Sequence, residues 1–294
     1  MRPPAALRRA AGAALIALSA LAAPASPAEA WRAASHLVIA QIAYDRLSED
    51  SRTEADRLIA ILADFEPRRD SFVSASLWLD DVRAQGWSAF DRWHYINLPF
   101  NDGGLGELPP AKTDNAVEAI ERALETLAGE QASDLAKAFS LRVLIHVVGD
   151  VHQPLHCVSR YTPDRPEGDR GGNDFELAED NLHFFWDRAG GLFDQRLGPE
   201  SSSGQIASAA AEVLARVPEA ALPARWQLDP HEWAREGHRL AVTVAYVGIA
   251  EGRSPSEVYR TRVQLVAQRR LVMAGYRLAA VLEKAFGEGP RSRE

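Results

Sequence analysis

The chain has 294 residues, of which 33 are basic and 41 acidic, so its formal net charge is −8 at pH 7. A chain this acidic is a poor match for proteins that bind duplex nucleic acid mainly through Lys and Arg contacts to phosphate. Cys157 is the only cysteine, which excludes an intrachain disulfide. Stability must therefore come from the hydrophobic core and from any bound metal.

The first 30 residues have the order of features found in a secretory signal peptide. Three arginines come first, an apolar stretch follows from Ala10 to about Ala23, and Ala28-Glu29-Ala30 forms an A-x-A cleavage site. The apolar stretch is shorter than the roughly 20 residues of a transmembrane helix, so an uncleaved anchor is the less favoured alternative. We expect a secreted or periplasmic protein that begins at Trp31 and has no membrane anchor after cleavage. It would keep 30 basic and 40 acidic residues, a net charge of −10.

Apolar residues recur at helical spacing along most of the remaining chain. The helices predicted cover residues 37–44, 51–62 with Ser51 as a possible N-cap, 71–83, 114–127, 135–153, 181–187, 202–217, 231–249 and 256–286. Pro154 should end or kink the helix before it. No segment alternates convincingly at the period of two of a β-strand. The sequence predicts an all-α, single-domain fold over residues 31–287 and a disordered tail at 288–294.

Histidines paired with acidic residues are the feature that indicates chemistry. His146 and Asp150 are four residues apart and would share one face of a helix, and His156 follows shortly after. The rest of that face is apolar, so an unpaired carboxylate there would be costly, and a bound cation would remove the cost. His183 and Asp187 repeat the spacing. One such pair alone is more often a surface hydrogen bond, but two pairs and His156 together favour a metal site.

Three upstream segments contain further residues suited to metal or phosphate. His36 follows the expected cleavage point, Asp80 and Arg83 lie beside a tryptophan, and His94 lies within an aromatic, apolar run. For His94 alone, a hydrogen-bonded histidine of the core is the more common arrangement. These residues indicate a metal site only in combination with the pairs His146–Asp150 and His183–Asp187.

The ordered motifs resemble the trinuclear-zinc single-strand-specific nucleases of fungi and plants. The H-x-x-x-D-x-x-x-x-x-H and N-L-H-x-x-W-D motifs carry the resemblance most specifically. It implies an all-α fold of the zinc phospholipase C and single-strand nuclease type, with three Zn²⁺ ions as cofactors. The implied metal ligands form three sets, namely Asp80, His94, His146 and Asp150; Trp31, His36 and Asp150; and His156, His183 and Asp187.

By the same resemblance, the first residue of the mature chain binds metal through its free α-amine and its carbonyl oxygen. The predicted cleavage before Trp31 would create that amine. Asp150 would bridge two ions, and a hydroxide held between them would attack phosphorus. Asp80 would orient this nucleophile, and Arg83 would contact the phosphate, which makes Asp80, Arg83 and Asp150 the implied catalytic residues.

A base-binding pocket is also implied by the resemblance. Tyr95 matches a position where an aromatic ring stacks on a base, and Asn97 matches one that reads the base edge. The run Arg170, Gly171, Gly172 and Asn173 matches a loop beside that pocket. The chain departs from the family at Ser35, where glycine is usual, at Asn97, where an acidic residue is common, and at Arg170, where a small apolar residue can occur.

The activity implied is hydrolysis of single-stranded DNA and RNA to 5′-phosphate products, with 3′-nucleotides as further substrates and no obligate protein partner evident. Zinc phospholipase C is one alternative, but it has glutamate at the last ligand and a longer gap between the first two. Asp187 and the Trp31–His36 spacing favour the nuclease. A non-catalytic exported zinc-binding protein is the other alternative, and it would need neither Arg83 nor the Tyr95–Asn97 pair.

Several other residues are expected to be structural. His152 lies two positions past Asp150 and should point away from the ligand face. Cys157 is expected to be a buried thiol. His231 and His238 have no acidic partner at ligand spacing. The set Arg262, Arg269 and Arg270 is expected to form a solvated helix face.

Overall fold

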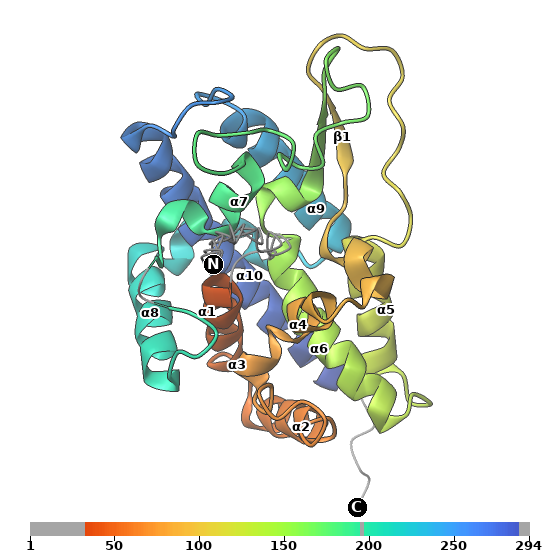
Figure 1. Ribbon diagram of the computed structural model, residues 1–294. Coiled ribbons are helices and arrows are strands. Elements are labelled where there is room, and N and C mark those ends of the chain that lie inside the picture. Colours follow the sequence, from red (N-terminus) through yellow and green to blue (C-terminus); the bar gives the residue numbers. More distant parts are fainter. Residues whose placement is uncertain (1–32, 195–196, 288–294) are drawn as a thin grey trace, which may run out of the picture.

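The computed structural model describes residues 33–194 and 197–287. The expected signal peptide, Trp31 and the expected tail therefore lie outside the described residues. The described chain is helical, as predicted (Figure 1). Its α-helices are α1 (Ala33–Tyr44), α2 (Glu49–Ala60), α3 (Phe72–Ala75), α4 (Trp78–Ala84), α5 (Ala116–Ala128), α6 (Asp134–Asp150), α7 (Leu182–Asp187), α8 (Ser203–Arg216), α9 (Pro230–Leu240) and α10 (Glu257–Gly287). Shorter helical segments are η1 (Ser88–His94), η2 (Pro154–Cys157), η3 (Ala189–Gly191), η4 (Glu219–Ala221), η5 (Pro223–Trp226) and η6 (Ala241–Ala245).

Two predicted helices differ from the structure, one at its start and one by an interruption. Helix α2 begins at Glu49, and its N-cap is Ser48 rather than Ser51, because the Ser48 hydroxyl accepts a hydrogen bond from the Ser51 amide. The predicted helix at 71–83 is two helices, α3 and α4, interrupted at Ser76 and Leu77. At the interruption, the carbonyl oxygen of Ser76 accepts a hydrogen bond from His146 on α6.

A short sheet was not predicted from the sequence. Strands β1 (Leu98–Asn101) and β2 (Val158–Tyr161) pair in parallel, with Leu98 opposite Val158. Each strand has only four residues, too few to give a clear alternation of polar and apolar positions. Just before the strands, the Ile96 amide donates to the His156 carbonyl oxygen over 2.7 Å. The pairing thus holds the segments of His94 and His156 side by side.

Helix α6 is the centre of the core. It packs against α5, α2, α4 and α1, and the long helix α10 packs against α1 and α6 (Figure 1). Its last two turns are fully buried, including His146 and Asp150. As predicted, Pro154 follows the end of this helix, and it opens η2. None of the helices in residues 33–194 and 197–287 combines the length and apolar character of a bilayer-spanning segment.

One arginine on α10 contradicts the expected solvated face. Arg262 and Arg269 are exposed, but Arg270 is buried and forms an ion pair with Glu236 over 2.8 Å. Arg277, two helical turns further along α10, is also buried and binds the same carboxylate. The sequence did not reveal this pairing because Glu236 lies on a different helix, α9.

Candidate metal centre

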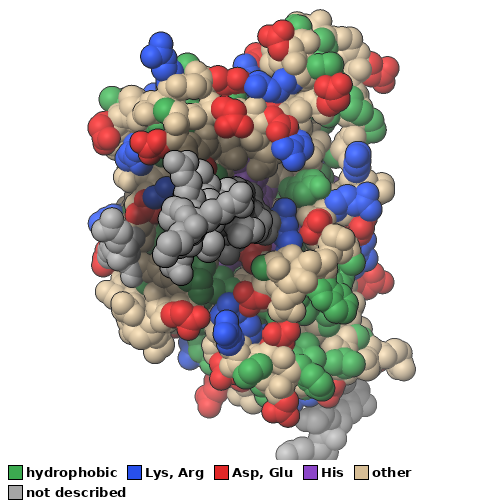
Figure 2. All heavy atoms as spheres, in the orientation of Figure 1, with side chains coloured by type: hydrophobic (Ala, Val, Ile, Leu, Met, Phe, Trp, Pro, Cys, Tyr) green, Lys and Arg blue, Asp and Glu red, His purple; other side chains and the backbone are tan. Residues whose placement is uncertain are grey.

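Eight of the nine predicted metal ligands are described, and all eight come together. They form three groups, and within each group the potential ligand atoms lie within 4.8 Å of one another. The groups are His36, His146 and Asp150; Asp80, His94 and His146; and His156, His183 and Asp187. Figure 2 shows histidine side chains in a hollow of the molecular surface. The residues are contributed by α1, α4, η1, α6, η2 and α7, so the site is assembled from segments spread along the chain.

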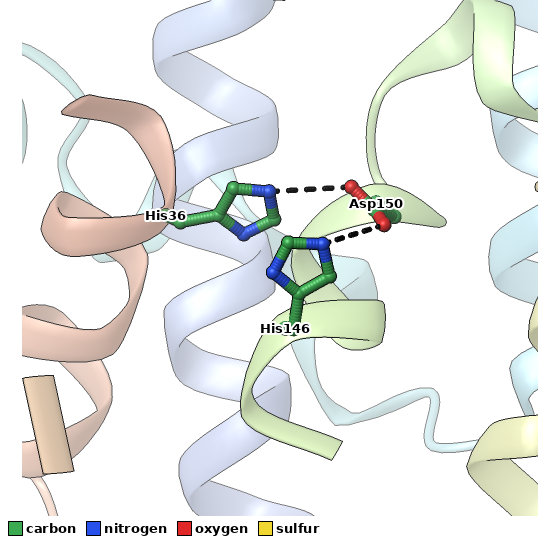
Figure 3. Close-up of side chains that lie close together, drawn as sticks. All are labelled: His36, His146 and Asp150. Atoms are coloured by element: carbon green, nitrogen blue, oxygen red, sulfur yellow. Dashed lines mark ion pairs between the residues drawn. The ribbon is translucent and has the colours of Figure 1, made fainter. Parts of the chain in front are cut away.

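Asp150 is the point where several imidazoles meet. His36 on α1 and His146 on α6 stack with ring centroids 4.0 Å apart, and each directs a ring nitrogen to Asp150 (Figure 3). The distances are 3.3 Å from His36 Nε2 to Oδ1 and 3.1 Å from His146 Nε2 to Oδ2. His94 Nδ1 lies 3.0 Å from the same Oδ2 and 3.1 Å from His146 Nε2. Imidazole nitrogens that could bind a metal therefore lie close to both carboxylate oxygens of Asp150.

Main-chain partners fix which nitrogen of three histidines carries the proton. In each, Nδ1 lies next to a carbonyl oxygen, which can only accept, so Nδ1 must donate its N–H. The neutral ring then has a lone pair on Nε2, and that atom faces carboxylate oxygens that are also acceptors. This is the usual arrangement around metal-binding histidines, in which the outer hydrogen bond orients the ring. The pairs are His146 with Ser76 (2.6 Å), His156 with His94 (2.8 Å) and His183 with Gly171 (2.8 Å).

Buried polar atoms without partners support a bound cation. In the described part of the chain they include both ring nitrogens of His36, Nε2 of His94 and His156, Oδ1 of Asp150 and Oδ2 of Asp187. Each such atom costs about 1–3 kcal/mol when left unsatisfied. Imidazole nitrogens together with carboxylate oxygens are a donor set that zinc accepts. The residues present therefore fit a metal centre.

The pKa values of the histidines also favour a bound cation. Burial, joined by the charge of His146, lowers the pKa of His36 to about 4 despite the opposing effect of Asp150. Burial also lowers the pKa of His94 to about 4, with smaller contributions from His146 and Arg83. Both rings are therefore neutral at pH 7 and can bind metal. At His146 burial is outweighed by the charges of Asp150 and Asp80, which raise the pKa to about 9, so this point attracts positive charge.

The third group has an outer residue that the sequence did not reveal. His156 and His183 stack with centroids 4.9 Å apart, and their Nε2 atoms lie 3.4 and 3.5 Å from the two oxygens of Asp187. The side-chain amide of Gln153 donates to Asp187 Oδ1 over 2.8 Å and accepts from the Leu155 amide. Gln153 thereby holds the carboxylate in place. Its only sequence signal is its position between Asp150 and His156.

The predicted glycine loop supports the third group through its backbone. Gly171 has φ +67°, and a Cβ there would collide with the carbonyl oxygen of Leu155, so glycine is required. Its own carbonyl oxygen accepts from His183. Nearby, buried Asp169 accepts from the Arg160 amide and the Tyr246 hydroxyl. These bonds tie the loop to β2 and η6.

The predicted substrate residues differ in exposure and in their hydrogen-bond and ion-pair partners. Arg83 is half-buried, 3.6 Å from Asp91, and close enough to His94 to affect its pKa. Tyr95 and Asn97 are half-buried and follow His94 directly in the chain. Arg170 is exposed and forms a hydrogen bond with Asp174. This bond raises the pKa of Arg170, and Tyr95 makes a smaller contribution in the same direction. The Asn173 side chain donates to the Arg170 carbonyl oxygen within the loop.

Comparison with known proteins now assigns this arrangement to a family. The family model for S1/P1 nuclease matches residues 31–287. The chain belongs to the S1/P1 nuclease family. Endonuclease 2 of Arabidopsis thaliana is 27% identical to it over 288 residues, which cover 87% of this chain and 91% of the plant protein. Nuclease P1 of Penicillium citrinum is 23% identical, with 87% and 98% covered, and Nuclease S1 of Aspergillus oryzae is 24% identical, with 86% and 91% covered.

Membership in the S1/P1 nuclease family confirms the family that the motifs indicated and the helical fold. It identifies the chain as a nuclease, an enzyme that acts on nucleic acid. It also implies zinc, which agrees with the donor set of the three groups.

A glycine of this S1/P1 nuclease gives a test of the geometry at His36. A Cβ on Gly149 of α6 would lie 2.8 Å from His36 Nδ1 and 3.0 Å from Cε1. Gly149→Ala should therefore displace the ring and weaken metal binding and activity by about 10- to 100-fold, the usual effect of disturbing a metal's surroundings. The change can be measured as zinc per chain and kcat on a single-stranded oligonucleotide.

The matched control is Gly204→Ala on α8, where a Cβ meets nothing within 4 Å. Both substitutions favour the helix equally in intrinsic terms. Gly204→Ala should keep full activity. Wild-type zinc content in active Gly149→Ala protein would contradict the close contact with His36.

Proposed function

We propose that the mature enzyme is an exported, three-zinc phosphodiesterase that hydrolyses single-stranded DNA and RNA to 5′-phosphate products. Under this proposal it also removes phosphate from 3′-nucleotides. It would begin at Trp31 after removal of residues 1–30. The observation that carries the proposal is the convergence of imidazole nitrogens on buried carboxylates in three neighbouring groups.

The proposed ligand assignment is the one that the family resemblance implies; the structure groups His146 with His36 and Asp150 as well as with Asp80 and His94. Asp80, His94, His146 and Asp150 would hold one ion. Asp150 would be shared with a second ion, which His36 and the α-amine and carbonyl oxygen of Trp31 would also bind. The third ion would be held by His156, His183 and Asp187. The 3.6 Å between His156 Nδ1 and Asp150 Oδ1 indicates that the third group is next to the other two.

Zinc, when bound, makes hydroxide available as a nucleophile near neutral pH and offsets the negative charge of a phosphate. The chain's own residues do the remaining work. Asp80, whose Oδ1 lies 3.7 Å from His146 Nε2, would orient the nucleophile. Arg83 would donate to the phosphoryl oxygens, where charge develops during the reaction.

Recognition of the substrate is proposed to depend on a base that has left its stack. The ring of Tyr95 would lie against that base, and the Asn97 amide would contact its edge. A base within a duplex cannot reach the ring without being unpaired, which costs free energy. This gives a preference for single strands without an extended basic surface. It also fits a chain of net charge −8, because positive charge is concentrated at the bound cations and Arg83.

The experiment compares initial rates on a single-stranded oligodeoxynucleotide, an oligoribonucleotide, the matching duplexes and short-chain phosphatidylcholine. Single strands should be cut fastest, leaving 5′-phosphate ends. Tyr95→Ala should lower kcat/KM on single strands by about tenfold or more, because stacking on an aromatic ring contributes roughly 1–3 kcal/mol per base. Its zinc content should be unchanged.

Tyr95→Phe is the matched control, since it keeps the ring and loses only the hydroxyl. It should retain most of the single-strand activity. If phosphatidylcholine is hydrolysed faster than any single strand, the proposed substrate is wrong and a phospholipid takes its place. Equal rates on single strands and duplexes would refute the role given to Tyr95.

A further inference from the structure

A cavity lies between α9 and α10. Its volume is about 450 Å³, within the range of pockets that hold small molecules. The apolar part of its wall comes from Leu222, Leu240, Val266 and Met273. Glu236 and Arg270 line it as well, and none of the predicted metal or substrate residues does. The nuclease reaction assigns it no role.

One residue of the cavity wall, Arg270, has a buried guanidinium with an unmet donor. Arg270 is only 5% exposed. Its Nε donates to the carbonyl oxygen of His152 over 2.9 Å, and its Nη1 donates to Glu236 over 2.8 Å. Its Nη2 is buried and has no hydrogen-bond partner among the described residues. A buried charged donor left unmatched costs free energy, so this atom marks a place for an acceptor.

The charge of the surroundings selects an anion. Arg277 is fully buried and binds the same carboxylate, with both terminal nitrogens within 2.8 Å of Glu236. Two guanidinium groups therefore share one carboxylate. His152 adds no charge, because its Nδ1 donates to a carbonyl oxygen and its Nε2 lies 3.0 Å from Arg277, where it must accept. One positive charge remains uncompensated, and exposed Arg239 and Arg269 add more at the rim.

We propose that this cavity binds a small amphipathic carboxylate, with its carboxylate on Arg270 Nη2 and its apolar body against Val266, Leu240 and Met273. The remaining Nη2 of the guanidinium can donate a charge-assisted hydrogen bond to a carboxylate. A dianionic phosphate fits less well, since Glu236 would repel its second charge in an apolar cavity. The site is separate from the proposed nuclease function and does not depend on it.

The test is calorimetric titration of the zinc-loaded enzyme with octanoate, and with octanamide as the uncharged molecule of equal length. Octanoate should bind one site per chain, about tenfold or more tighter than octanamide, because a charge-assisted hydrogen bond is lost with the amide. Absence of saturable octanoate binding, or equal binding of both molecules, would overturn the proposal.

Two pairs of variants locate the binding. Val266→Phe should fill the cavity and abolish binding, whereas Val258→Phe, at an exposed position on the same helix, should not. Ala224→Glu at the exposed part of the wall should weaken binding by repulsion, and Ala224→Gln should do so far less. All four should cut oligonucleotides at wild-type rates. Octanoate binding that Val266→Phe leaves unchanged, with competitive inhibition of the nuclease, would place the ligand at the metal centre and refute the cavity site.

Discussion

Replacing Asp150 with asparagine is expected to lower kcat on single-stranded DNA by at least about 10³-fold, a loss typical of removing one member of a catalytic group that acts as a unit. Asp150 is fully buried, and its two oxygens face His36, His94 and His146. An amide has one oxygen instead of two and no charge, so it cannot serve two cations. We expect zinc content to fall together with turnover, with the helical circular dichroism retained.

The matched control is Asp134→Asn at the opposite end of α6. Its carboxylate is 62% exposed and pairs with Arg57 on α2. Exposed pairs of this kind contribute little to stability, so the enzyme should remain folded and active. Comparable losses of kcat in the two variants would mean that Asp150 acts through general stability of the helix and holds no metal.

A single extra residue at the N-terminus is expected to have the next largest effect. The α-amine of Trp31 is proposed as a metal ligand beside His36, whose ring nitrogens have no hydrogen-bond partner in the described chain. A free α-amine has a pKa near 7.7–8.0 and binds metal once deprotonated, whereas a peptide nitrogen has no available lone pair. A protein beginning Ala30-Trp31 should therefore lose the zinc shared with His36 and most of its kcat.

The comparison requires two sequence-verified preparations, one beginning at Trp31 and one at Ala30, measured for zinc per chain and for kcat. His183 and Asp187 do not involve the N-terminus, so the third ion should remain in both preparations. Equal zinc and equal rates would remove Trp31 from the ligand set. The second ion would then need another donor.

The sequence predicted the helical fold class, which the structure confirms. The spacing of His146 and Asp150, repeated at His183 and Asp187, indicates shared helix faces, and the structure places both pairs in groups that could hold a metal ion. Helical periodicity gave most helices, but not the break between α3 and α4. At that break Ser76 accepts a tertiary hydrogen bond from His146, which no local pattern records.

Contacts between distant segments account for the other misses. The strands β1 and β2 pair residues about sixty positions apart, and each is too short for a period to be read. Arg270 carries the same signal in sequence as its exposed neighbour Arg269, but it is buried, with Glu236 of α9 and the His152 carbonyl oxygen as partners. Gln153 supports Asp187 through an amide that could equally have faced water.

The number of zinc ions per active chain tests the central claim most directly. Elemental analysis of homogeneous protein beginning at Trp31, with kcat measured on the same sample, should give three zinc ions per chain. Stepwise chelation should abolish turnover and lower the Tm, because ions that bind only the folded chain stabilise it. One zinc or none in fully active protein would contradict the three-zinc account.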